Sequence, residues 1–198
     1  MKLKVKGLLL AAGSSSRMGT PKQLLPWGQT TMIGHCISEA KRSKLDSLLV
    51  VLGAEAAQIQ TAITDDATDI AINKHWSGGI ASTIKTGVDQ ITSNDTVDGI
   101  LIMLADPSLV STNYLNKLIE AFDSSNRIVA STYDQSLGVP AIFGAAHFDL
   151  LMTLEGDRGA GYILNARRNS VKTIAASTEL TDIDTMEAYT ALRPPLDG

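Results

Sequence analysis

Residues 8–28 read LLLAAGSSSRMGTPKQLLPWG and place an apolar run directly before a loop of glycine and serine. Small residues let backbone N–H groups approach an anion closely, and successive N–H groups in a turn form an anion-binding concavity. Arg17 adds a planar set of donors that suits phosphate, and Lys22 adds a mobile positive charge. The loop therefore predicts a polyphosphate site, and a flexible turn with two solvated cations is the alternative.

The loop differs from two common nucleotide-binding motifs. Gly19 is followed by Thr-Pro-Lys, whereas a Walker loop has Lys and then Ser or Thr after its last glycine. The G-x-G-x-x-G motif of dinucleotide-binding folds is missing from the loop as well. The predicted phosphate site is therefore of another kind.

A second group that could do chemistry is Asp106, which closes the apolar run GILIMLAD. A charge directly after a buried strand requires a partner or a metal ion, and Mg2+ prefers one or two carboxylates together with phosphate oxygens. On the residues alone, Asp106 is either a metal ligand or the start of an Asp-Pro turn that opens the next loop.

These groups can meet only if the elements before them end at one edge of a sheet. Apolar runs that alternate or are continuous predict strands. They lie at 3–11, 47–52, 69–72, 99–105, 127–131, 139–143 and 171–175. Segments of helical period between them predict helices. These lie at 31–43, 55–64, 79–91, 112–122, 145–154, 159–165 and 185–192.

This alternation predicts an α/β fold with a doubly wound, mostly parallel open sheet. The interval between 127–131 and 139–143 leaves no room for a helix, so one hairpin-like antiparallel strand is expected. Ligands of such sheets bind beyond the carboxyl ends of strands, where the opening loop and Asp106 fall. No linker interrupts the chain, so a single domain is expected over residues 1–198.

Composition narrows the expected partners and location. Apolar residues make up 44% of the chain, charged residues 19%, and the net charge is -4. This balance argues against nucleic acid or an anionic membrane as a partner. The single cysteine, Cys36, excludes an internal disulfide and is expected to be a small buried apolar residue. No apolar run reaches the roughly 18 residues of a membrane span, so the cytoplasm is the expected location.

The run from Leu8 to Gly28 resembles the signature of the MobA-like nucleotidyltransferases, and within them it is most similar to molybdenum cofactor cytidylyltransferases. Their pattern is L-A-A-G-x-S-x-R-M-G-x-x-K-x-L-L-P. The resemblance implies a Rossmann-like fold of the nucleotide-diphospho-sugar transferase type. It also implies that the backbone of residues 11–13 lies against the base of a nucleoside triphosphate, and that Arg17 and Lys22 hold its phosphates as catalytic cations.

Two further segments resemble the same family. NKHWSGGIASTIKTG is similar to N-x-x-W-x-x-G-x-x-x-S-x-x-x-G, with its serine one place earlier, and TDIDTMEAY is similar to D-I-D-T-x-E-D-Y. The implied nucleotide site consists of Ala11, Ala12, Gly13, Ser14, Ser15, Arg17, Lys22, Asn73, Gly79 and Ser82. The implied metal site joins Asp106 to Asp184, with Asp182 as the competitor for the second place. The alternative for Asp184 is a helix N-cap paired with Glu187.

Some departures from the family pattern bear on the substrates. Ala12 stands where the guanylyl branch usually has glycine, which favours CTP over GTP. Val139 replaces a common histidine in a segment similar to G-x-P-x-x-F, and Gly161 replaces the usual arginine of G-D-x-G-A-R. Arg158 can substitute for that arginine, or the acceptor differs from molybdopterin. Pro107 comes one residue earlier than the proline of the family.

The resemblance implies a Mg2+-dependent enzyme that transfers CMP from CTP to a phosphorylated acceptor, such as the molybdenum cofactor, and releases pyrophosphate. A molybdoenzyme or its chaperone is the partner protein that this activity implies. Two other functions stay open. One is a guanylyltransferase or sugar-phosphate nucleotidyltransferase of the same fold, and the other is a non-catalytic nucleotide-binding module.

Overall fold

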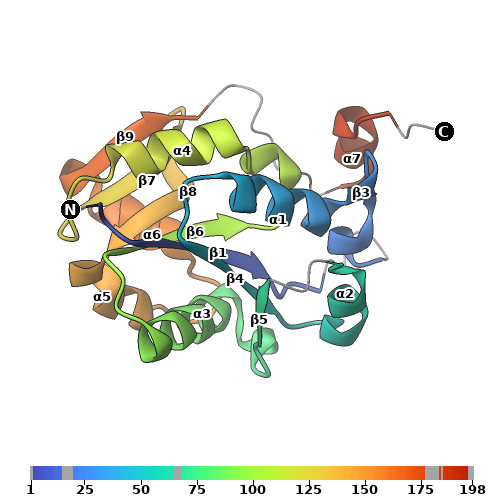
Figure 1. Ribbon diagram of the computed structural model, residues 1–198, viewed down its shortest axis with the longest axis horizontal. Coiled ribbons are helices and arrows are strands. Elements are labelled where there is room, and N and C mark those ends of the chain that lie inside the picture. The colour runs from blue at the N-terminus through green and yellow to red at the C-terminus, as the bar shows by residue number, and fades with distance from the viewer. Residues whose placement is uncertain (1, 15–19, 65–67, 177–182, 184, 196–198) are drawn as a thin grey trace.

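The computed structural model describes residues 2–14, 20–64, 68–176, 183 and 185–195, and it has one large sheet at its centre (Figure 1). Seven strands form this sheet in the spatial order β5-β4-β1-β6-β8-β7-β9. Their bounds are β1 Val5–Ala11, β4 Ser47–Leu52, β5 Asp69–Ile72, β6 Gly99–Leu104, β7 Ile128–Tyr133, β8 Ser136–Gly144 and β9 Val171–Ala175. Strand β1 pairs in parallel with β4 and with β6, so the mostly parallel open sheet is confirmed.

Strand β8 runs antiparallel to both of its neighbours, β6 and β7. Residues 134–135 alone connect β7 to β8, which is too short for a crossover, so β8 must return beside β7. Asp134 has a φ of 47°, in the left-handed region that tight hairpin turns use. The expected antiparallel strand is confirmed, and its amino end lies next to the carboxyl end of β6.

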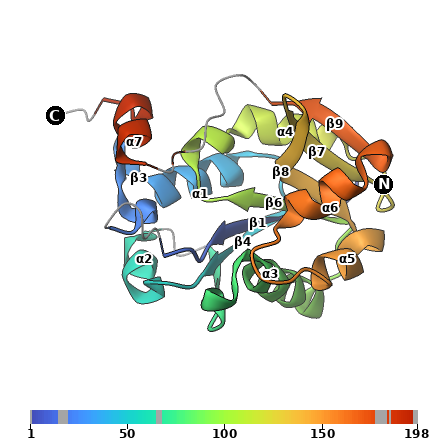
Figure 2. The same ribbon diagram turned by 180° about the vertical axis from the view of Figure 1, so that it is seen from behind.

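Helices cover both faces of the sheet (Figures 1 and 2). One face carries α1 (Met32–Arg42), α2 (Ala56–Ala62) and α4 (Thr112–Ala121), and the other carries α3 (Ile80–Asn94), α5 (Phe148–Met152) and α6 (Ala160–Ala166). Side chains along β1 alternate between the two cores, because successive residues of a strand face opposite ways. Leu9 packs under α1 and α4, whereas Leu8 packs under α3. The doubly wound architecture is therefore confirmed.

Short elements connect this framework. The 3-10 turns are η2 Lys22–Leu24, η3 Trp76–Gly78, η4 Pro107–Leu109, η5 Ala145–His147 and η6 Arg168–Ser170. The expected helix over 145–154 is divided into η5 and α5, and the N–H of Phe148 donates to the carbonyl of Ala145 in the i→i+3 pattern of a 3-10 turn. A hairpin of β2 (Pro26–Trp27) and β3 (Thr30–Thr31) was not expected, since its strands are too short to show a pattern.

Helix α7 (Met186–Leu192) begins after Thr185, whose hydroxyl accepts a hydrogen bond from the N–H of Ala188. Thr185 is therefore the N-cap, and the alternative in which Asp184 caps this helix with Glu187 as its partner is wrong by one residue. Asp184 itself lies outside the described residues. The threonine provides the same capping chemistry one position later.

The C-terminal segment is attached to the start of α1 by a small apolar core. Ile183 and Tyr189 pack there against Trp27 and Met32. The hydroxyl of Tyr189 also donates to the carbonyl of Pro26 at 2.6 Å. This packing brings residue 183 to the carboxyl edge of the sheet, beside Trp27 and Met32, which are far from it in the sequence.

None of the helices in the described part of the chain combines the length and the apolar character that a bilayer span requires.

We predict that Gly87→Ala destabilises the protein, although alanine is the better helix former by about 1 kcal/mol. A Cβ at Gly87 in α3 would lie 2.2 Å from Cδ1 of Leu8, which is fully buried in β1. Such overpacking costs about 1–3 kcal/mol, so the free energy of unfolding in urea should fall. The matched control is Gly161→Ala in α6, where the nearest atom to the new Cβ is the carbonyl oxygen of Leu137 at 3.6 Å. The control should be neutral or stabilising, and equal effects of the two changes would contradict the prediction.

Candidate active site

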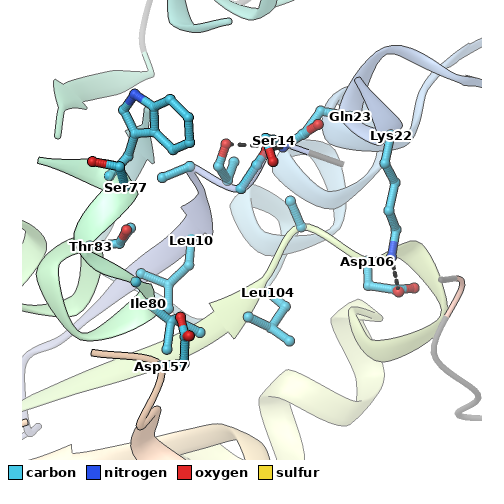
Figure 3. A pocket seen from close by; sticks show the side chains of 16 residues that line it. Leu10, Ser14, Lys22, Gln23, Ser77, Ile80, Thr83, Leu104, Asp106 and Asp157 are labelled. Atoms are coloured by element: carbon cyan, nitrogen blue, oxygen red, sulfur yellow. Dashed lines mark hydrogen bonds and ion pairs between the residues drawn. The ribbon is translucent and has the colours of Figure 1, made fainter. Parts of the chain in front are cut away.

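A cavity of about 490 Å3 opens at the carboxyl ends of β1 and β6 (Figure 3). This volume is in the range of small-molecule sites. Its lining combines residues 10–14 after β1, Lys22 and Gln23 of η2, several residues between Trp76 and Thr83, residues 104–106 after β6, and Asp157. The loops that follow the parallel strands thus meet around one space, as the fold predicts.

Gln23 restrains the turn that follows β1. Its side-chain Nε2 donates to the carbonyl oxygens of Ala11 and Gly13, each at 3.1 Å. The residue is only 5% exposed. Because one amide nitrogen carries two hydrogens, this single side chain holds two carbonyl groups of the turn.

Lys22 and Asp106 form an ion pair at one end of the cavity (Figure 3). The Nζ of Lys22 lies 2.7 Å from Oδ2 of Asp106, and the two side chains are 16% and 4% exposed. Attraction between opposite charges is stronger in such a protein environment than in water. Two residues predicted to be catalytic are therefore brought together, from η2 and from the end of β6.

The carboxylate of Asp106 also accepts three other hydrogen bonds. Its Oδ1 accepts from the N–H of Ser108 at 3.2 Å and from the hydroxyl of Ser108 at 2.8 Å. This is the turn proposed as the alternative role of Asp106, and the structure confirms it alongside the ion pair. Its Oδ2 accepts from the N–H of Ile183 at 3.0 Å. The chain around residue 183 therefore reaches Asp106.

Asn73 and Ser82 lie behind the cavity wall. The amide of Asn73 donates to the hydroxyl of Ser82 at 2.8 Å and to that of Thr83 at 3.1 Å, and its oxygen accepts from the N–H of His75 at 2.9 Å. Asn73 is 2% exposed. These bonds connect the end of β5 to the first turn of α3, so both side chains shape the wall rather than face the space.

Gly79 brings the start of α3 against the backbone near Gly156. Gly79 has a φ of 87°, and a Cβ there would lie 2.3 Å from the carbonyl oxygen of Gly156. That same oxygen accepts from the N–H of Ala81 at 3.1 Å. Only glycine fits this close approach. The contact places Asp157, which follows Gly156, on the rim of the cavity.

Trp76 lines the cavity beside its neighbour Ser77, which lies on the side away from the ion pair in Figure 3. The side chain of Trp76 is 38% exposed. A Cβ built on Gly53 would lie 2.5 Å from Cβ of Trp76 and 2.7 Å from Cβ of Ala12, so Trp76 and Ala12 approach each other across that glycine. An aromatic face and small apolar groups suit a planar ring. The cavity therefore has an apolar end and a charged end.

No thiol or imidazole is placed to act as a nucleophile or base within the described residues. Cys36 is fully buried in α1, as expected, and burial together with the charge of Asp106 raises the pKa of its thiol well above the usual value. Burial also lowers the pKa of His35, although the carboxylate of Glu39 opposes this change. The described residues contain no group of three or more His, Cys, Asp or Glu that could hold a metal ion by themselves.

The predicted site residues fall into three groups. Those that line the cavity are Ala11, Ala12, Gly13, Ser14, Lys22, Gly79 and Asp106. Asn73 and Ser82 lie behind its wall. Ser15, Arg17, Asp182 and Asp184 lie outside the described residues, so their roles stay predictions. Sequence reasoning missed Gln23, which occupies an unspecified position of the opening pattern, and assigned no role to Asp157 although it belongs to the G-D-x-G-A segment.

A model of a known protein family matches most of this chain. The model of the MobA-like NTP transferase domain matches residues 7–171. Purine catabolism protein PucB of Bacillus subtilis is 31% identical over 94% of this chain and 95% of that protein. Nicotine blue oxidoreductase of Paenarthrobacter nicotinovorans is 29% identical over 92% of this chain and 93% of that protein.

Solved structures agree with this match. Rv0371c of Mycobacterium tuberculosis is 30% identical, with a TM-score of 0.83 over 96% of this chain and 97% of that chain. A complex of Rv0371c with manganese has a TM-score of 0.80 at 27% identity, over 96% of this chain and 98% of that chain. Since the family model spans the opening turn, Lys22, Asp106 and the sheet as far as β9, this chain belongs to the family of MobA-like NTP transferase domains.

Proposed function

We propose that this protein transfers CMP from CTP to a phosphorylated acceptor such as the molybdenum cofactor, with release of pyrophosphate. The observation that carries the proposal is the buried ion pair of Lys22 and Asp106, which lies at one end of a cavity next to a small-residue turn. An ammonium group and backbone N–H groups bind phosphate, and a carboxylate binds a divalent cation. Membership of the MobA-like NTP transferase family supports this class of reaction.

The transfer forms one P–O bond and breaks another. An oxygen of the acceptor phosphate, already anionic near neutral pH, attacks the α-phosphorus of CTP. The bond from that phosphorus to the oxygen that bridges to the β-phosphate breaks, and its electron pair leaves with pyrophosphate. The reaction needs no protein nucleophile or base, in keeping with the inert thiol of Cys36. The protein contributes alignment and stabilisation of charge.

Asp106 is the residue that we assign to a divalent cation. Its surroundings fit one, because Oδ2 of this buried carboxylate already has a positive group at 2.7 Å. The manganese complex of the related Rv0371c supports a divalent cation in this kind of protein. We propose Mg2+ as the ion and Asp184 as the second carboxylate, with Asp182 as its competitor. Bound there, the ion supplies charge neutralisation to the phosphates.

Lys22 has two roles in this proposal. Without ligands its ammonium group neutralises the buried charge of Asp106, which the hydrogen bonds from Ser108 and Ile183 stabilise but do not neutralise. Asp106 would hold the cation in place of the ammonium group, and Lys22 would then turn to the phosphates, where Arg17 is the second predicted cation. The flexible four-carbon side chain of lysine allows such an exchange.

Other features bear on the base and on the acceptor. The methyl group of Ala12 lies at the apolar end of the cavity near Trp76, where we place the cytosine ring. For the acceptor phosphate we propose Arg158, which follows the rim residue Asp157. The guanidinium carbon of Arg158 lies 4.8 Å from the ring centroid of Tyr162, and this contact holds it on the surface.

We expect Asp106→Asn to lower kcat/KM for CTP-dependent pyrophosphate release by roughly 100-fold or more, because the variant keeps the shape of the side chain and loses its charge. Pyrophosphate is measured with a coupled assay in the presence of Mg2+ and molybdopterin. The control is Asp149→Asn, an exposed residue of α5, which should behave as wild type. Unchanged pyrophosphate release by Asp106→Asn would contradict the assigned role.

Thermal-shift measurements with the four nucleoside triphosphates, with and without Mg2+, test which base the site prefers, independently of the reaction. CTP at about 100 times its Kd should add about 2.7 kcal/mol of apparent stability, and GTP should add clearly less at the same concentration. Stabilisation by CTP without pyrophosphate release would favour a non-catalytic nucleotide-binding module. A lack of stabilisation by every triphosphate would overturn the proposal.

We expect Lys22→Met to change the affinities for metal and nucleotide in opposite directions. Without the competing ammonium group, Mn2+ alone should bind more tightly to the variant than to wild type, as measured by electron paramagnetic resonance. The affinity for CTP should fall by about tenfold, the value of one charge-assisted hydrogen bond. Lys117→Met, at an exposed position of α4, is the control. Weaker binding of Mn2+ to Lys22→Met would argue against the exchange.

A further inference from the structure

The carbonyl groups at the end of β1 are all engaged by donors of the protein. The carbonyl of Leu10 accepts from the N–H of Ala105 at 3.1 Å, and that of Ala12 accepts from the N–H of Ala54 at 3.0 Å. The carbonyls of Ala11 and Gly13 accept from Nε2 of Gln23, as described above. Two of the four bonds therefore depend on one side chain.

The N–H groups of the same turn are used differently. Between described residues, no hydrogen bond starts from the N–H of Ala12, Gly13 or Ser14. All three residues line the cavity. Since their carbonyls are occupied as far as Gly13, the turn offers a ligand N–H donors and few acceptors. Each residue other than proline carries one backbone donor and one backbone acceptor, so an excess of available donors arises only where other groups of the protein occupy the acceptors.

The turn lies between the two ends of the cavity. Lys22 and Asp106 mark the charged end, where the phosphates belong. Ala12 approaches Trp76 at the apolar end, where the proposed site holds the base. In the proposed site, the N–H groups of the turn near Trp76 would therefore face the edge of the nucleobase rather than the reacting phosphorus.

We propose that Gln23 is a positioning residue that makes the site select cytosine over guanine, an inference that rests on the proposed function. On its Watson–Crick edge, cytosine carries two adjacent acceptors, O2 and N3. Guanine carries two adjacent donors there, the N1–H and the 2-amino group. A turn that presents N–H groups is complementary to cytosine and leaves the guanine donors without partners. A buried polar group without a partner is strongly disfavoured, so the polarity of the turn discriminates between the bases.

Gln23 maintains this polarity by fixing two peptide units. Without its amide, the carbonyls of Ala11 and Gly13 have no side-chain donor, and these peptide units can turn an oxygen toward the ligand. The donors of guanine then have carbonyl acceptors in the turn, whereas the O2 and N3 acceptors of cytosine no longer face only N–H donors. The arrangement also explains why a polar side chain that is only 5% exposed is placed beside a ligand cavity.

The test compares wild type with Gln23→Met, which keeps the length of the side chain and removes both donors. Dissociation constants for CTP and GTP are measured by isothermal titration calorimetry with Mg2+. The ratio of the GTP constant to the CTP constant should fall by about tenfold, the value of one hydrogen bond in discrimination. Gln60→Met, at an exposed position of α2, is the matched control and should keep the wild-type ratio.

Gln23→Ala is the second variant, and circular dichroism checks that both variants are folded. Either folded variant with the lowered ratio supports the inference. An equal loss of affinity for both nucleotides overturns it, because the turn then faces the phosphates, and so does an unchanged ratio. If wild type binds CTP selectively and the ratio does not depend on Gln23, only this inference fails. If wild type binds neither nucleotide, the proposed function fails with it.

Discussion

The attraction between Lys22 and Asp106 is the interaction on which the arrangement of the site depends. A carboxylate with 4% of its side chain exposed would be costly without compensation. Lysine, two donors from Ser108 and the N–H of Ile183 provide that compensation from three separate parts of the chain. The carboxylate therefore holds three separate segments of the chain around itself before any ligand binds.

The sheet explains why these parts of the chain can meet. Strands β1 and β6 are adjacent and parallel, so the turn after Ala11 and Asp106 emerge side by side. Strand β8 runs antiparallel to β6, so β8 begins at the edge of the sheet where β1 and β6 end. In the proposed function, nucleotide and acceptor would thus approach Asp106 over parallel strands on one side and over a hairpin on the other. One framework can keep a constant nucleotide site while the acceptor side varies.

The hydrophobic pattern was sufficient to predict this framework, because strands that are buried on both faces of a sheet have continuous apolar sequences, such as 47–52 and 99–105. It could not place the C-terminal segment, whose position depends on a few contacts of Ile183 and Tyr189 with residues near the start of α1. The alternative of an N-cap at Asp184 was one residue early, because aspartate and threonine are both good caps and the sequence alone does not distinguish them. Chemical type predicted Lys22 and Asp106 as site residues, whereas Gln23 shows no spacing or charge that distinguishes it from a surface glutamine.

Gln23 also shows how a site can gain selectivity without a side chain that touches the ligand. The backbone of a turn carries donors and acceptors together, so it cannot discriminate between bases until one set is removed. Hydrogen bonds from Ala54, Ala105 and Gln23 remove the acceptors, and two of these three residues act through the backbone that the sheet itself positions. The remaining contribution is a side chain in η2, next to Lys22. A single short turn therefore carries both the cation that neutralises Asp106 and the amide that sets the polarity of the base site, so a shift of η2 would disturb charge and base recognition together.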